Sequence, residues 1–123
     1  MSARLKKILV VDDDRPVLNY LTRMLALMKY KVTSAVDAVE ALRKKPESFD
    51  LVISDLSLPQ KSGLWLLSRV RDKGSKIKFM LMSGNADPEE LRELKKYEMT
   101  RFIRKPFKIE ELMEIMEELS MDN

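Results

Sequence analysis

The chain has 123 residues, the usual size of one compact domain and too few for two. Apolar residues make up 45% of it and charged residues 35%, which is typical of a globular protein rather than a disordered or fibrous one. It contains neither Cys nor His, which excludes disulfides, thiol nucleophiles, Ser-His-Asp catalysis, phosphohistidine chemistry and the usual zinc sites. Any chemistry must therefore rest on Asp, Ser and Lys.

The net charge of +3 comes from basic residues that are mixed with acidic ones along the whole chain, and the aromatic residues form no stacking platform on a basic strand. We therefore expect no direct binding of nucleic acid by this domain. The apolar run Ile8–Val11 is far shorter than the hydrophobic region of a signal peptide, and no other run could span a bilayer. The sequence predicts a cytoplasmic protein without a membrane partner.

Apolar runs of strand character alternate along the chain with segments whose apolar residues recur at helical spacing. Residues 5–12, 50–54 and 77–82 read as apolar runs, the first of them continuous as in a strand buried on both faces, whereas residues 30–35 alternate as a short strand. The predicted strands cover residues 5–12, 30–35, 50–54, 77–82 and 101–104, and the helices that follow them cover residues 15–28, 37–42, 64–70, a segment from residue 87, and 109–119.

Capping signals mark the starts of several predicted helices. Asp37 with Glu40 three residues later has the spacing of a capping box. Asp87 followed by Pro88 combines an N-cap with a proline at the first helical position. The last helix has a weaker start, because Lys108 stands where Ser or Asp is usual.

Five strand-then-helix units predict an α/β fold, a doubly wound parallel sheet with helices on both faces and right-handed crossovers. Ligands in such folds bind beyond the carboxyl ends of the strands. The polar residues that close the strands are therefore expected to meet at one edge of the sheet. These residues are Asp12, Asp13, Asp55, Ser83 and Lys105.

Three carboxylates brought together repel one another, and a cluster of oxygen ligands suits a hard cation such as Mg²⁺. One divalent cation together with Lys105 would balance the charge of Asp12, Asp13 and Asp55.

The sequence resembles the receiver domain of two-component response regulators, of the chemotaxis-receiver type, over almost its whole length. The resemblance implies a single receiver domain over residues 1–123, with five strands in the order 2-1-3-4-5. It rests on the run Val10–Asp14, on Asp55 with Pro59 and Gly63 downstream, on Met82-Ser83-Gly84 and on Lys105-Pro106-Phe107.

The resemblance assigns Asp55 as the residue that accepts a phosphoryl group, in a Mg²⁺-dependent reaction, from a sensor histidine kinase or a phosphotransfer protein. Asp13, Asp55 and the backbone carbonyl of Ser57 would bind Mg²⁺ directly, and Asp12 would bind it through water. Such a domain promotes only its own phosphorylation and dephosphorylation, so it is a signalling domain and not an enzyme acting on other molecules.

The resemblance also assigns Lys105 and Ser83 to phosphoryl oxygens, and Ser83 with Phe102 to a conformational switch. The switch would alter the surface formed by the helix from residue 87, the strand 101–104 and the last helix. A downstream effector protein or a second copy of the chain would bind there. Phe102 replaces a Tyr found in many members, so the ring has no hydroxyl group.

Two other functions are compatible with the same residues. One is a Mg²⁺-dependent phosphohydrolase with an Asp nucleophile, but such enzymes of the haloacid dehalogenase type carry a second Asp where this chain has Ser57, and no lid-sized insertion is present. The other is a receiver-like domain that acts without phosphorylation. Each site residue alone is also compatible with an ordinary cap, turn or surface role, and only their joint occurrence favours the receiver.

Overall fold

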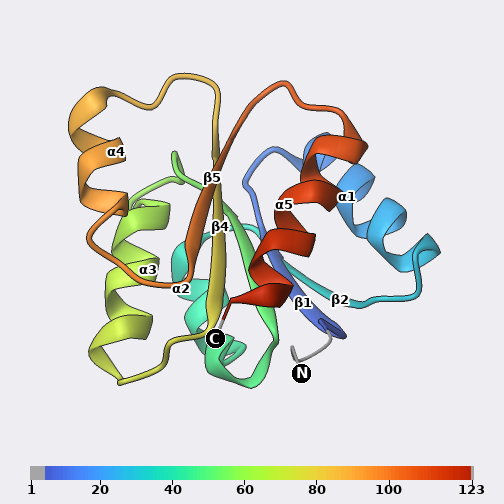
Figure 1. Ribbon diagram of the computed structural model, residues 1–123, viewed down its shortest axis with the longest axis horizontal. Helices are drawn as coiled ribbons and strands as arrows, with labels where there is room; N and C mark the ends of the chain where they lie inside the picture. Colours follow the sequence, from blue (N-terminus) through green and yellow to red (C-terminus); the bar gives the residue numbers. More distant parts are fainter. Residues whose placement is uncertain (1–4, 123) are drawn as a thin grey trace.

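Five parallel strands in the order β2-β1-β3-β4-β5 form the centre of the structure (Figure 1). This computed structural model describes residues 5–122, so the expected domain limits at residues 1 and 123 lie outside the described residues. The predicted strand order and the alternation of strands and helices are confirmed. The strands are β1 (Lys7–Val11), β2 (Lys31–Ala35), β3 (Leu51–Asp55), β4 (Lys78–Ser83) and β5 (Thr100–Arg104), and the helices are α1 (Arg15–Leu27), α2 (Ala38–Arg43), α3 (Gly63–Asp72), α4 (Pro88–Leu94) and α5 (Ile109–Met121).

Each predicted element is present, with bounds that shift by a few residues. One turn of 3-10 helix at Pro46–Ser48, which the sequence analysis did not predict, follows α2. The N-caps expected at Asp37 and Asp87 are confirmed, because each side chain accepts a hydrogen bond from the N–H three residues later. Within the described part of the chain, no helix has the length and apolar character needed to cross a membrane.

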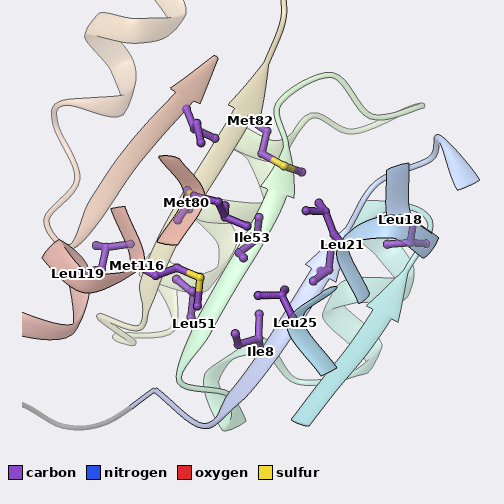
Figure 2. Close-up of a cluster of buried hydrophobic side chains, with 13 residues drawn as sticks. Ile8, Leu18, Leu21, Leu25, Leu51, Ile53, Met80, Met82, Met116 and Leu119 are labelled. Atoms are coloured by element: carbon purple, nitrogen blue, oxygen red, sulfur yellow. The ribbon is translucent and has the colours of Figure 1, made fainter. Parts of the chain in front are cut away.

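The alternation of side chains along the strands divides the core into two layers. One face of the sheet packs against α1 and α5 through Ile8, Val10 and neighbouring side chains. The other face packs against α2, α3 and α4 through Leu9, Val11 and neighbouring side chains. Figure 2 shows the first layer, in which strand residues such as Ile53 and Met80 meet Leu21 of α1 and Met116 and Leu119 of α5. Because β3 is covered on both faces, all five of its residues are buried.

Gly63 begins α3 against the carboxyl end of β3. Its N–H donates to the Leu56 carbonyl oxygen at 2.9 Å, which holds the helix start against the strand end. A Cβ atom at this position would overlap the carbonyl oxygen of Asp55 and would lie 2.8 Å from Leu81 Cδ2. The close approach requires a residue without a side chain, and it couples the position of α3 to that of Asp55.

We predict that Gly63→Ala lowers the free energy of unfolding by about 1–3 kcal/mol, the usual cost of forcing an extra methyl group into a packed site. Gly84→Ala is the matched control, since a Cβ there would lie at an ordinary 3.6 Å from the Lys105 carbonyl oxygen. Urea unfolding of both variants measures the difference. Equal stability of the two variants would contradict the steric argument.

Candidate functional site

The polar residues that close the strands meet at one edge of the sheet, as predicted. Asp12 and Asp13 follow β1, Asp55 is the last residue of β3, Ser83 is the last of β4, and Lys105 follows β5. The parallel register brings these ends level, because Asp55 lies opposite Met82 and Ser83 lies opposite Arg104. One carboxylate oxygen from each of Asp12, Asp13 and Asp55 lies within 4.8 Å of the others.

Lys105 connects two of the carboxylates through its ammonium group. Its Nζ donates to Asp55 Oδ2 at 2.7 Å and to Asp12 Oδ2 at 2.9 Å. Burial alone would lower the pKa of Lys105, but the hydrogen bonds to Asp55 and Asp12 outweigh burial and raise the pKa. Lys105 is therefore a permanent cation at neutral pH that faces both carboxylates.

Asp12 lies at the bottom of the site, with no exposed surface. Its Oδ2 accepts from Lys105, and its Oδ1 accepts from the Asp14 N–H at 2.9 Å. Burial penalises the charged carboxylate and raises the pKa of Asp12, although the hydrogen bonds from Lys105 and Asp14 oppose this shift. Burial thus makes the charged form of Asp12 more costly than it would be in water.

Asp55 is held by donors on both of its oxygens. The Ser57 N–H donates to Oδ1 at 2.9 Å, and the Lys105 ammonium group donates to Oδ2. The residue is buried, but its side chain keeps 12% of its surface exposed. Asp55 is thus fixed in orientation and still open to a reactant from solvent. Only the backbone carbonyl of Ser57 was predicted to belong to the site. Its N–H was not predicted, because the contact of this group with Asp55 depends on the turn after β3.

The donor set at this edge fits a hard divalent cation. The ligand atoms available from the three carboxylates are all oxygen, and Asp13 is exposed beside the two buried groups. Three carboxylates and one ammonium group leave two negative charges uncompensated, which is the charge of one divalent cation. Mg²⁺ takes oxygen ligands, keeps several of its waters and needs few protein groups. The cluster is therefore typical of a Mg²⁺ site.

Ser83 is buried, and its hydroxyl group is engaged with a neighbour in its own loop. It donates to Asn85 Oδ1 at 3.3 Å and accepts from the Asn85 N–H at 3.1 Å. The sequence analysis missed this pairing, although Ser and Asn two residues apart in a strand-to-helix loop is a turn signal that could have indicated it. The hydroxyl group is therefore not committed to Asp55 in this conformation.

Phe102 lies on β5 opposite Leu81 and is partly buried. It lines a hollow of about 490 Å³ between α4 and β5, together with Leu91, Leu94 and Lys95. The Phe102 ring therefore borders the hollow on the side of α4. Its strand, β5, pairs with β4, which ends at Ser83.

The loop before β5, whose shape the sequence leaves open, is braced by Arg71 from α3. Its guanidinium group donates to the Glu98 carbonyl oxygen at 2.7 Å and to the Ser75 carbonyl oxygen at 3.1 Å. Met99 adopts a left-handed conformation with φ of 61°. The guanidinium group thus connects the loop after α3 to the loop before β5.

The fold and the acidic edge define a class, the doubly wound α/β proteins that bind charged ligands at the carboxyl ends of their strands. Within this class, residues 8–117 match the family model described as "Response regulator receiver domain". The chain belongs to the response regulator receiver family, and it is a signalling domain of two-component systems.

Known proteins agree with this assignment. The chain is 35% identical over 112 residues to the two-component response regulator ARR10 of Arabidopsis thaliana, a match that covers 89% of this chain and 20% of ARR10. It is 31% identical to the transcriptional regulatory protein KdpE of Staphylococcus aureus, with 86% of this chain and 46% of KdpE covered. The chain thus spans about a fifth to a half of the length of these relatives.

Among solved structures, the chemotaxis response regulator CheY4 of Vibrio cholerae superposes with a TM-score of 0.83 at 28% sequence identity. The superposition covers 94% of this chain and 99% of CheY4. The expected chemotaxis-receiver fold is confirmed.

The burial of Asp12 predicts a specific pH dependence in the metal-free protein. A carboxyl group whose pKa is raised in the folded state favours folding below its ordinary value of 3.8, and this contribution is lost as the pH rises through the raised value. Asp12→Asn removes the titrating carboxyl group and with it the loss of this contribution at higher pH. The free energy of unfolding of the variant should therefore rise relative to that of the wild type as the pH rises from acid to neutral. Urea unfolding with a chelator present measures the difference, and a difference that stays constant with pH would refute the argument.

Proposed function

We propose that this domain is a phosphorylation-dependent switch in which Asp55 accepts a phosphoryl group from a sensor histidine kinase or a phosphotransfer protein. The observation that supports the proposal most directly is the Lys105 ammonium group placed between Asp12 and Asp55. It leaves Asp55 as the one carboxylate that is fixed by donors, paired with a cation and still open to solvent.

In the reaction, a carboxylate oxygen of Asp55 attacks the phosphorus atom of the donor. An oxygen–phosphorus bond forms, and the bond from phosphorus to the leaving group breaks, with the electron pair departing on the leaving group. Lys105 moves from the carboxylates to a phosphoryl oxygen, where its positive charge offsets the added negative charge. The product is an acyl phosphate on Asp55.

Asp13 and Asp55, with the backbone carbonyl of Ser57, would hold Mg²⁺ directly, and Asp12 would hold it through water. When bound, the cation supplies the positive charge that lets an anionic donor approach an anionic nucleophile. Its binding also offsets the repulsion among the carboxylates, which Lys105 alone compensates only in part.

An apolar hollow beside Lys105 supports docking of a protein donor at this edge. It measures about 450 Å³, and Tyr20 on its wall is half exposed. A helix that carries a phosphohistidine toward Asp55 would cover this surface. The hollow is lined by Pro16, Val17, Tyr20, Leu21, Lys105, Pro106 and Phe107.

The switch depends on Ser83 exchanging Asn85 for a phosphoryl oxygen. Ser83 and Asp55 close neighbouring strands, so the hydroxyl group can turn inward once a phosphoryl group is present. The movement changes the packing beside Phe102, whose ring borders the hollow under α4. The surface of α4, β5 and α5 would then change and bind a downstream effector or a second copy of the chain. The two conformations exist in equilibrium, and phosphorylation shifts their populations.

The phosphohydrolase alternative is less well supported. Its general acid would stand at Ser57, whose side chain is a hydroxyl group and not a carboxyl group. A receiver that acts without phosphorylation would not need Lys105 paired with two carboxylates.

We predict that incubation with acetyl phosphate and Mg²⁺ adds one phosphoryl group to Asp55. Intact mass spectrometry should show a single addition that is labile to base and hydroxylamine, as an acyl phosphate is. Asp55→Asn should abolish the addition, because the amide is not a nucleophile under these conditions. Chelation of Mg²⁺ should slow it strongly.

The matched control is Asp50→Asn, which changes a carboxylate that binds the Lys6 and Lys7 N–H groups on β1 and lies away from the site. Asp50→Asn should be phosphorylated as the wild type is. Persistence of the modification in Asp55→Asn would show that another residue is the acceptor.

We predict that beryllofluoride, a stable mimic of the phosphoryl group, perturbs NMR signals from α4, β5 and α5 in the wild type. Ser83→Ala should bind beryllofluoride and show a much smaller perturbation, because the group that responds to the ligand is missing. Asn85→Ala, which removes the side-chain acceptor of Ser83 and leaves the Asn85 N–H in place, should keep the perturbation. Equal perturbation in wild type and Ser83→Ala would exclude Ser83 as the link.

A further inference from the structure

Helices α1 and α5 cover the same face of the sheet, as Figure 1 shows, and both carry exposed apolar side chains. Scattered apolar groups are normal on protein surfaces, whereas gathered ones mark sites of interaction. Among the described residues, four of the five exposed large apolar side chains lie on these two helices. They are Tyr20 (50% exposed) and Leu27 (69%) on α1, and Met113 (46%) and Met121 (64%) on α5, while the fifth is Val39 (38%) on α2.

The charges on the two helices are segregated by sign. Helix α5 carries five Glu and no Lys or Arg, whereas α1 carries Arg15 and Arg23 and no acidic residue. Helical spacing places Arg23 on the same side as Tyr20 and Leu27, which lie three residues before it and four after it. The same spacing places Glu114 and Glu117 on the side of α5 that carries Met121. Each helix thus presents apolar groups around charges of a single sign.

The two helices also border a hollow of about 620 Å³ at the end of the sheet opposite the acidic site. One wall comes from Met28 and Tyr30 after α1, and the other from Met113, Met116, Glu117 and Met121 of α5. Methionine side chains are flexible and adapt to varied partners. Lys6, Lys29 and Ser120 also line the hollow, so it adds a mixed polar and apolar surface to this face.

We propose that α1 and α5 form a two-fold interface between two copies of this chain, with α1 of each copy packed on α5 of the other. In a two-fold interface the same patch serves both partners, so the patch must be complementary to itself. The basic-apolar side of α1 and the acidic-apolar side of α5 meet this condition. Tyr20 and Leu27 would pack against Met113 and Met121 of the second copy, and Arg23 would face its Glu114 and Glu117. Because Tyr20 also borders the hollow beside Lys105, this dimer and a donor protein docked at that hollow would compete for the same side chain.

The size of this surface sets the strength of the association. Two 13-residue helices side by side give a face about 20 Å long and about 20 Å wide. This is smaller than the roughly 800 Å² per partner that standard stable complexes bury. The dimer should therefore be weak, dependent on concentration and weakened by salt, because opposite charges contribute to it. It does not depend on phosphorylation and uses the side of α5 that faces away from α4.

Sedimentation equilibrium over a range of protein concentrations tests the proposal without any phosphoryl donor. The wild-type mass should rise from one chain toward two, and high salt should reduce the rise. Leu27→Asp and Met121→Asp should each raise the dimer Kd by about tenfold or more, since each places a charge at an apolar contact. Val39→Asp is the matched control on α2 and should leave the Kd unchanged.

A charge exchange tests the arrangement of the helices. Arg23→Glu and Glu117→Lys should each weaken the dimer, and the chain with both changes should regain much of the lost affinity. Lys95→Glu, on the α4 side of the molecule, should have no effect. A wild-type chain that stays monomeric at all concentrations, a dimer that tolerates Leu27→Asp and Met121→Asp, or a double variant that regains nothing would overturn the proposal.

Discussion

The bridge from Lys105 to Asp12 and Asp55 is the interaction on which the site depends. It places one cation against two carboxylates in a largely buried position, where charges without partners are costly. Asp12 has no exposed surface, so its pKa is raised even with Lys105 and Asp14 as hydrogen-bond donors. The pair is therefore not optimised for the stability of the metal-free protein. Its residual negative charge is what favours a divalent cation and prepares the site for an anionic reactant.

The parallel sheet makes this arrangement possible, because it brings residues distant in sequence to the same height. Lys105 is 93 residues from Asp12 and 50 from Asp55, yet one ammonium group contacts both carboxylates. The Lys105 N–H donates to the Ser83 carbonyl oxygen at 2.9 Å, so pairing of β4 with β5 fixes where the side chain starts. Gly63 fixes Asp55 from the other side, because the start of α3 lies directly against its carbonyl group. Backbone contacts thus set the site geometry, and the side chains only complete it.

The strands, the helices and the edge at which the polar residues gather were predictable, because the central strands β1, β3 and β4 are apolar runs, each closed by a polar residue. The order of the strands came from the family resemblance and not from periodicity. The pairing of Ser83 with Asn85, the bond from the Ser57 N–H to Asp55 and the bracing of Glu98 by Arg71 were not predicted. The spacing of Ser83 and Asn85 could have indicated their pairing, whereas the other two contacts depend on loop conformations that sequence spacing does not encode.

Helix α5 has a different role on each of its two exposed sides. Toward β5, Glu118 and Asp122 pair with Arg101 at 3.3 and 3.0 Å, so these acids are already compensated within the chain. Toward α1, Glu117 lies beside the methionines of the open hollow. A shift of β5 on phosphorylation would act on the first side directly, through Arg101. The second side would respond only if α5 moved as a whole. The two surfaces can therefore bind different partners with little mutual interference, because Leu112, Met116 and Leu119 anchor the helix to the sheet between them.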